Sequence, residues 1–187
     1  MAPRPSPNGR SIYAGPWRID LAVRPGVPRL LGQAGLARTI AIALDAAGAP
    51  QPASIGLILT SDSELAGLNA EHMGKSGPTD VLSFPLLPPT AFPDHRGRAM
   101  AASAPAFEFA LPPGRRPHLG DIVVSVERAI DQAEAGRGGQ TGDVRWSAAD
   151  ELRLLVTHGT LHVCGWDHAD PVEEAEMRAL EQQLLQE

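Results

Sequence analysis

The 187-residue chain has little cysteine and no long apolar run, and both absences narrow its class. Its one cysteine, Cys164, excludes an intrachain disulfide framework and suits a reducing compartment. No stretch approaches the roughly 18 apolar residues that a membrane span needs, and residues 1–17 contain no apolar run of signal-peptide length. We therefore expect a cytoplasmic protein that does not interact with a membrane.

The chain also lacks an excess of positive charge, since its formal net charge is -6. This sum does not exclude a nucleic-acid partner, because the charges are unevenly distributed. From Ser147 to the end there are nine acidic residues and two basic ones, which leaves the rest of the chain close to neutral. An acidic C-terminal helix can face solvent while an arginine-bearing surface elsewhere contacts phosphate groups.

Hydrophobic periodicity predicts an α/β (α+β) fold in which helices pack against one mixed sheet of about four strands. The predicted strands are 17–23, 54–60, 80–86 and 118–126. The predicted helices lie within 28–48, 61–69, 127–135, 147–165 and 170–187. Ser61 and Glu64 have the spacing of a capping box at the start of the second helix.

The length of the chain favours a single domain. Proline and glycine are more frequent than usual, which predicts irregular segments. Residues 1–15 are rich in proline and glycine without periodicity, so we expect a flexible N-terminal arm. Residues 16–187 are expected to form the domain, interrupted by a Pro/Ala/Arg-rich insertion at about 88–117.

The strongest predicted helix carries a histidine pattern that fits a metal site. Ser147 is a good N-cap, and Gly165 can end the helix in the left-handed conformation. His158 and His162 are four residues apart and share one helix face, while His168 follows the glycine and can approach from another direction. Three imidazoles suit one Zn²⁺ ion with an open position for water, so the sequence predicts a catalytic zinc site at this helix end.

The spacing H-x-x-x-H-x-x-G-x-x-H differs in one residue from the pattern of metzincin proteases. Gly159 stands where those enzymes have the glutamate that acts as general base, which argues against a peptidase. The alternative, that these are ordinary histidines near a helix end, fits one histidine better than three at ligand spacing. Cys164 is expected to be a small buried residue that points away from the site.

Three segments resemble the YbeY family of metal-dependent endoribonucleases, the bacterial rRNA maturation factors. They are "PTDVLSFP" (Pro78 to Pro85), "HLGDIVVS" (His118 to Ser125) and "HGTLHVCGWDH" (His158 to His168). The resemblance covers about 17–185. It implies a zinc ion held by the three histidines in a cleft beside the sheet, and catalysis through the metal-bound water.

The resemblance also implies a substrate and partners. Family members are implicated in maturing the 3′ end of small-subunit rRNA and in ribosome quality control. The expected substrate is single-stranded RNA on ribosomal particles, with ribosomal proteins or assembly factors as further partners. The general base stays open between the RNA 2′-hydroxyl, Asp167, Asp121 and solvent.

Further residues are assigned to the site as hypotheses. Five are expected to contact substrate: Asn69, His72, Lys75, Asp80 and Ser83. Two acids, Asp121 and Asp167, are expected to orient the histidine ligands from outside the coordination sphere.

One departure from the family pattern bears on activity. Met73 stands where the family usually has an arginine thought to bind the phosphodiester, and methionine cannot make that bidentate contact. His72, Lys75 or arginines of the insertion (Arg96, Arg98, Arg115 and Arg116) are candidates to compensate. Two alternatives therefore stay open: a ribosome-assembly or docking factor with structural zinc and weak or no cleavage, and a zinc hydrolase of another substrate.

Overall fold

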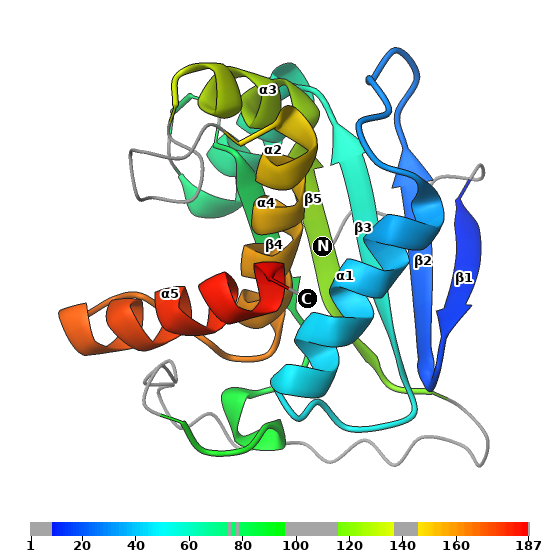
Figure 1. The fold of residues 1–187 in the computed structure, drawn as a ribbon, viewed down its shortest axis with the longest axis vertical. Helices are drawn as coiled ribbons and strands as arrows, with labels where there is room; N and C mark the ends of the chain where they lie inside the picture. The colour runs from blue at the N-terminus through cyan, green and yellow to red at the C-terminus, as the bar shows by residue number, and fades with distance from the viewer. Residues whose placement is uncertain (1–8, 75, 78, 96–115, 137–145, 187) are drawn as a thin grey trace.

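The computed structural model describes residues 9–74, 76–77, 79–95, 116–136 and 146–186. They form one mixed α/β domain around a five-stranded sheet of order β1-β2-β3-β5-β4 (Figure 1). The strands are β1 (Arg10–Ala14), β2 (Trp17–Val23), β3 (Ala53–Thr60), β4 (Val81–Pro85) and β5 (His118–Ser125). The three central strands β2, β3 and β5 are parallel, and the two edge strands are antiparallel to their neighbours.

In the part of the chain that the structure describes, five α-helices and one short turn of 3-10 helix accompany the sheet: α1 (Gln33–Ala46), α2 (Asp62–Met73), the 3-10 turn η1 (Pro89–Ala91), α3 (Val126–Glu134), α4 (Ala148–Val163) and α5 (Pro171–Leu185). Helices α1 and α4 lie side by side across one face (Figure 1). Helix α2 covers part of the opposite face, where Leu65 packs against Ile58 and Val123. No helix in the described ranges is both long and apolar enough to cross a membrane.

Strand β3 explains why the sheet is covered on both faces. Its sequence "ASIGLILT" is mostly apolar and is buried at every position, as expected for a central parallel strand. Ile55, Leu57 and Leu59 belong to the main core beneath α1 and α4, whereas Ile58 belongs to the smaller cluster beneath α2. The main core also supports α4, the helix that carries the candidate ligands.

The sequence predicts about four strands, and the described residues form five. The additional strand, β1, lies in the segment predicted to be a flexible arm. Arg10–Ala14 pairs with β2 as a hairpin in which Ala14 is opposite Trp17 and Ile12 is opposite Ile19. The expectation of a flexible arm is therefore wrong for these residues, while residues 1–8 lie outside the described part. Strand β1 is an edge strand with mostly exposed side chains, so it lacks the apolar alternation that identifies buried strands.

The predicted insertion at about 88–117 is part of the domain where it is described. Phe92 is 4% exposed and belongs to the main core, and Pro89 lies close to Gly165. The guanidinium of Arg116 donates a hydrogen bond to the carbonyl of Pro16 and lies over the ring of Tyr13. The other three arginines considered as phosphate contacts, Arg96, Arg98 and Arg115, lie outside the described residues.

Candidate metal centre and adjoining cleft

Helix α4 begins as its sequence predicts. The Ser147 hydroxyl accepts a hydrogen bond from the Asp150 backbone N–H, and the Asp150 carboxylate accepts one from the Ser147 backbone N–H. This reciprocal pair is a capping box and satisfies amide groups that have no partner within the helix. The cap fixes where the helix starts and therefore which side chains face the sheet.

The end of α4 brings the third histidine back toward the helix. The N–H of Trp166 donates to the carbonyl of Leu161, and the N–H of Gly165 donates to that of His162. Together with the positive φ of Gly165, +83°, this is a Schellman motif, as the predicted helix stop at Gly165 requires. The chain reverses there, so His168 lies beside the last turn of the helix.

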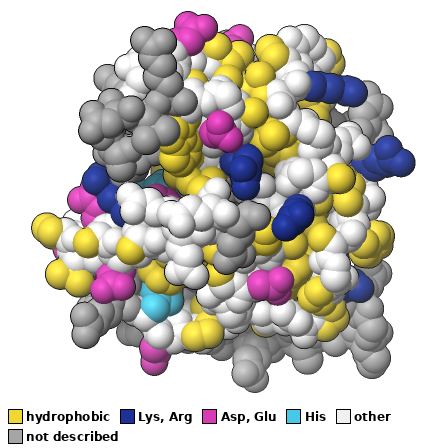
Figure 2. Space-filling view, in the orientation of Figure 1, with side chains coloured by type: hydrophobic (Ala, Val, Ile, Leu, Met, Phe, Trp, Pro, Cys, Tyr) yellow, Lys and Arg dark blue, Asp and Glu magenta, His cyan; other side chains and the backbone are white. Residues whose placement is uncertain are grey.

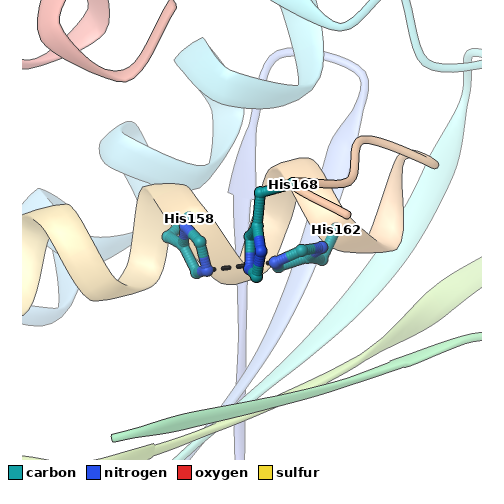
Figure 3. Close-up of side chains that lie close together, drawn as sticks. All are labelled: His158, His162 and His168. Carbon is teal, nitrogen blue, oxygen red and sulfur yellow. Dashed lines mark hydrogen bonds between the residues drawn. The ribbon is translucent and has the colours of Figure 1, made fainter. Parts of the chain in front are cut away.

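The three predicted ligands converge in space (Figure 3). His158 and His162 project from α4, and His168 reaches toward them from the segment after the helix. The Nε2 atoms of His158 and His162 are 3.0 Å apart, and one ligand atom from each of the three rings lies within 4.8 Å of the others. Two nitrogens bound to one tetrahedral zinc lie roughly 3.3 Å apart, given Zn–N bonds of about 2.0–2.1 Å.

Hydrogen bonds on the other ring nitrogens define how the two helix histidines are protonated. His162 Nδ1 is 2.9 Å from the carbonyl oxygen of Trp166, and His158 Nδ1 is 2.6 Å from a carboxylate oxygen of Glu181. Both partners are acceptors, so each Nδ1 carries a proton, and in a neutral ring the Nε2 then presents a lone pair. The two Nε2 atoms are 3.0 Å apart, which is hydrogen-bond distance when one of them carries a proton (Figure 3). When both rings are neutral with their protons on Nδ1, two lone pairs face each other there, and a shared cation would remove the resulting repulsion.

Burial keeps His162 neutral, as a metal ligand must be. Burial, together with the neighbouring rings of His158 and His168, lowers the pKa of His162 to about 4. The imidazole is therefore deprotonated at neutral pH and its Nε2 is available as a ligand. The three histidines thus fit a metal ion in number and position, and His162 also fits in its protonation state.

A cleft of about 820 Å³ adjoins the histidines and is formed mainly by β4, the end of α2 and the segment after α4. Among the described residues that line it there is no lysine or arginine, and Asp80 and Asp167 are its acids. Histidine atoms reach the molecular surface beside α5 in the space-filling view (Figure 2). A bound metal cation would therefore be the main positive charge of the described cleft.

Three of the residues expected to contact substrate line this cleft, but each already has a partner within the protein. Asn69 donates from Nδ2 to the carbonyl of Gly77, at 3.0 Å. Ser83 donates from its hydroxyl to the carbonyl of Gly159, also at 3.0 Å. Asp80 accepts hydrogen bonds from the Val81 N–H and from the side chain of Gln132. Their observed contacts hold the walls of the cleft in place.

The remaining residues of that group lie elsewhere or are not described. His72 packs edge-on against the ring of Phe84, with ring centroids 5.3 Å apart, and is not among the residues that line the cleft. Lys75 lies outside the described residues. Met73 does line the cleft and is 46% exposed, so the position of the missing arginine faces the site.

The two acids expected to orient ligands have different positions. Asp167 lines the cleft and accepts a hydrogen bond from the His168 backbone N–H at 2.8 Å, which fixes the chain at that ligand. Asp121 instead lies 3.1 Å from Nε2 of His118. Its neighbour Ile122 faces α4, so Asp121 points to the opposite face of the sheet and does not contact the three histidines.

The contact that orients His158 comes from Glu181, which the sequence analysis missed. Glu181 is only 3% exposed and lies on the inner side of α5 with Met177 and Leu184. A glutamate among apolar residues at helical spacing is the sequence signal that could have identified it, because charged side chains are rarely buried without a partner. The backbone carbonyl of Trp166 performs the same task for His162.

Packing explains the glycine that replaces the protease glutamate. A β-carbon at Gly159 would lie 2.6 Å from Cγ2 of Ile122 and 3.0 Å from Cγ2 of Val81. Position 159 therefore faces the sheet, at a point where α4 is too close for a side chain. A glutamate at this position would have to displace these side chains, so the packing gives a structural reason for the glycine.

The fold and site together define an α/β protein with a candidate metal centre of three histidines and an adjoining open cleft, an arrangement typical of metal hydrolases. The family model described as "Endoribonuclease YbeY" matches residues 32–187. The chain therefore belongs to the YbeY family, as the three sequence segments predicted.

Individual relatives agree with this assignment. The Endoribonuclease YbeY of Salinispora tropica is 41% identical over 144 residues, which cover 76% of this chain and 79% of that protein. The one from Thermobifida fusca is 37% identical over 167 residues, covering 89% of this chain and 91% of that protein. The solution structure of TM1509 from Thermotoga maritima has a TM-score of 0.50 at 20% identity, over 90% of this chain and 87% of that one, and it supports the fold.

Proposed function

We propose that the protein is a zinc-dependent endoribonuclease that cleaves single-stranded RNA in the maturation of small-subunit rRNA 3′ ends and in ribosome quality control. Family membership supports the endoribonuclease activity and the place in rRNA processing. The structural observation that carries the proposal is the pair of Nε2 atoms, His158 and His162, that face each other at 3.0 Å with His168 beside them.

The three histidines would hold one Zn²⁺, and the cleft would hold the RNA strand. A zinc ion held by these neutral ligands would keep its full charge, which would polarise a phosphoryl oxygen and lower the pKa of bound water toward about 7. Asp167, the RNA 2′-hydroxyl and solvent are the remaining candidates for the base beside the metal, because Asp121 lies on the far face of the sheet. The expected surroundings are the cytoplasm and a ribosomal particle with its proteins or assembly factors.

A second candidate is a ribosome-assembly or docking factor in which zinc has a structural role. The observation that favours it is Met73, which faces the cleft in place of the arginine. The cleft also has no lysine or arginine among its described lining residues, so it offers little to bind a phosphodiester apart from the metal. The two candidates differ in whether the zinc-loaded protein cuts RNA.

The experiment that separates them uses purified protein of known zinc content and an oligonucleotide that carries the 3′-end sequence of small-subunit rRNA. The oligonucleotide is supplied single-stranded or annealed to its complement. We expect the single strand to be cut, the duplex to be spared, and the His158→Ala variant to be inactive on both. Intact single-stranded RNA with fully zinc-loaded protein would favour the docking factor, and equal cleavage by the variant would reveal a contaminating nuclease.

A further inference from the structure

The C-terminal helix contributes a buried carboxylate to the candidate metal centre. Glu181 Oε1 lies 2.6 Å from Nδ1 of His158, and the Glu181 side chain is 4% exposed. The two residues come from different helices and are 23 positions apart in the chain. The contact therefore exists only when α5 is docked beside α4.

The surroundings of Glu181 show that this carboxylate is not part of an ordinary solvated helix face. It lies on the same side of α5 as Met177, which is 1% exposed, and Leu184, which is 6% exposed. A carboxylate among such neighbours is costly unless a strong donor satisfies it. The Nδ1–H of His158 is that donor, and the short distance is typical of a hydrogen bond that involves a charged group.

We propose that Glu181 is a positioning residue for the metal centre. By accepting a hydrogen bond from Nδ1–H, it holds His158 in the tautomer whose Nε2 lone pair points into the site, and it makes that nitrogen a stronger ligand. It also fixes the plane of the ring, so that the direction of the lone pair is set before a metal arrives. The inference rests on the zinc site of the proposed function.

A consequence is that metal binding and the docking of α5 stabilise each other. A metal on Nε2 strengthens the hydrogen bond at Nδ1, and the Glu181 carboxylate in turn favours the metal-bound state of His158. By contrast, His162 is oriented by the backbone carbonyl of Trp166, which remains in any side-chain variant. A substitution at Glu181 can therefore alter the orientation of His158 while leaving the histidine itself in place.

The test compares the zinc affinity of metal-stripped wild-type protein with that of Glu181→Gln and Glu181→Ala, by competition with a chelator of known affinity. In Glu181→Gln the side-chain amide oxygen can still accept a hydrogen bond from Nδ1–H but carries no charge, whereas Glu181→Ala removes the acceptor. We expect zinc affinity to fall by about 10–100-fold in Glu181→Ala, with Glu181→Gln between it and the wild type. Circular dichroism establishes that each variant is folded before its affinity is measured.

A matched control comes from the same helix. Glu173 is also buried, at 5% exposure, but it is not among the three ligands or the hydrogen-bond partners found for them. Glu173→Gln should leave zinc affinity within about twofold of the wild type, because it changes a buried carboxylate of α5 without touching a ligand. An equal loss in Glu173→Gln and Glu181→Gln would indicate a general effect of altered packing and overturn the proposal.

A second readout separates a positioning role from a purely structural one. When Co²⁺ replaces zinc, its visible spectrum reports ligand geometry, and we expect Glu181→Ala to alter it while Glu173→Gln does not. Folded Glu181→Ala with wild-type affinity and spectrum would refute the inference and leave the proposed function intact. A wild-type protein that binds neither ion would instead refute the metal site itself.

Discussion

Gly159 and Ile122 meet so closely that a β-carbon added to the glycine would lie 2.6 Å from Cγ2 of the isoleucine. This contact brings α4 directly onto β5 in the turn between the two helix histidines. The ligands therefore emerge at the side of the contact, where the cleft opens. The glycine after His158 is a packing requirement of this fold.

Replacing Gly159 with alanine should destabilise the protein by about 1–3 kcal/mol, because the added methyl group overpacks the contact between helix and sheet. The measurement is urea unfolding of the metal-free protein. Gly67 of α2 is the matched control, since a β-carbon there meets nothing within 4 Å. Gly67→Ala should be neutral or stabilising by up to about 1 kcal/mol. Equal stability of Gly159→Ala and the wild type would contradict the observed closeness of α4 and β5.

Replacing His162 with alanine should abolish tight zinc binding. The variant loses one of three ligands, and metal binding to the folded state contributes stability. Metal analysis after dialysis should find about one zinc per wild-type chain and little in the variant, and the melting temperature in excess zinc should fall. His72→Ala is the control, because His72 packs against Phe84 outside the site. Unchanged metal content in His162→Ala would refute the assignment of the ligands.

Replacing Met73 with arginine should increase kcat/KM for single-stranded RNA by roughly tenfold, the order expected for one charged hydrogen bond to phosphate. Met73 is 46% exposed and lines the cleft, so the longer side chain has room to reach the substrate. Steady-state cleavage by the wild type, Met73→Arg and the neutral Met73→Gln is the measurement. If the arginine variant is no faster than the glutamine variant, phosphate is bound by other groups and the departure from the family pattern has little effect.

The thiol of Cys164 should not react in the folded protein. The residue is fully buried in the main core, and burial raises its pKa to about 12. A disulfide-exchange reagent at a pH of about 8 should label the thiol only after denaturation. Because unfolding returns the pKa to its ordinary 9.0, the unfolded state releases a proton first and stability should decrease as the pH rises from 9.0 toward about 12. Rapid labelling of the native protein would place Cys164 at the surface and contradict the core packing.

Local sequence signals predicted much of the fold and the three histidines that the structure brings together. The cap at Ser147, the stop at Gly165 and the spacing of the histidines depend on neighbours within a few residues, and the structure confirms the cap, the stop and the convergence of the three rings. The apolar run of β3 was equally clear because both of its faces are buried.

Interactions between distant residues explain what the sequence did not reveal. Ser61 begins α2, but the predicted capping box with Glu64 does not form. Glu64 instead accepts a hydrogen bond from Arg24, 40 residues earlier in the chain, with a shortest N–O distance of 2.6 Å. Tertiary pairing likewise explains strand β1, which no local pattern encodes. It also explains the contact between Glu181 and His158, because the spacing of residues in α5 can indicate that Glu181 is buried but cannot identify its partner.

The central claim, that the three histidines hold a metal needed for RNA cleavage, is tested most directly by adding zinc back to metal-stripped protein. The measurement is the initial rate of cleavage of single-stranded RNA as a function of zinc equivalents, with His168→Ala measured in parallel. We expect the wild-type rate to rise linearly and reach a plateau near one equivalent, while the variant stays inactive. A wild-type rate that is independent of added zinc, or an equal response in His168→Ala, would contradict the account.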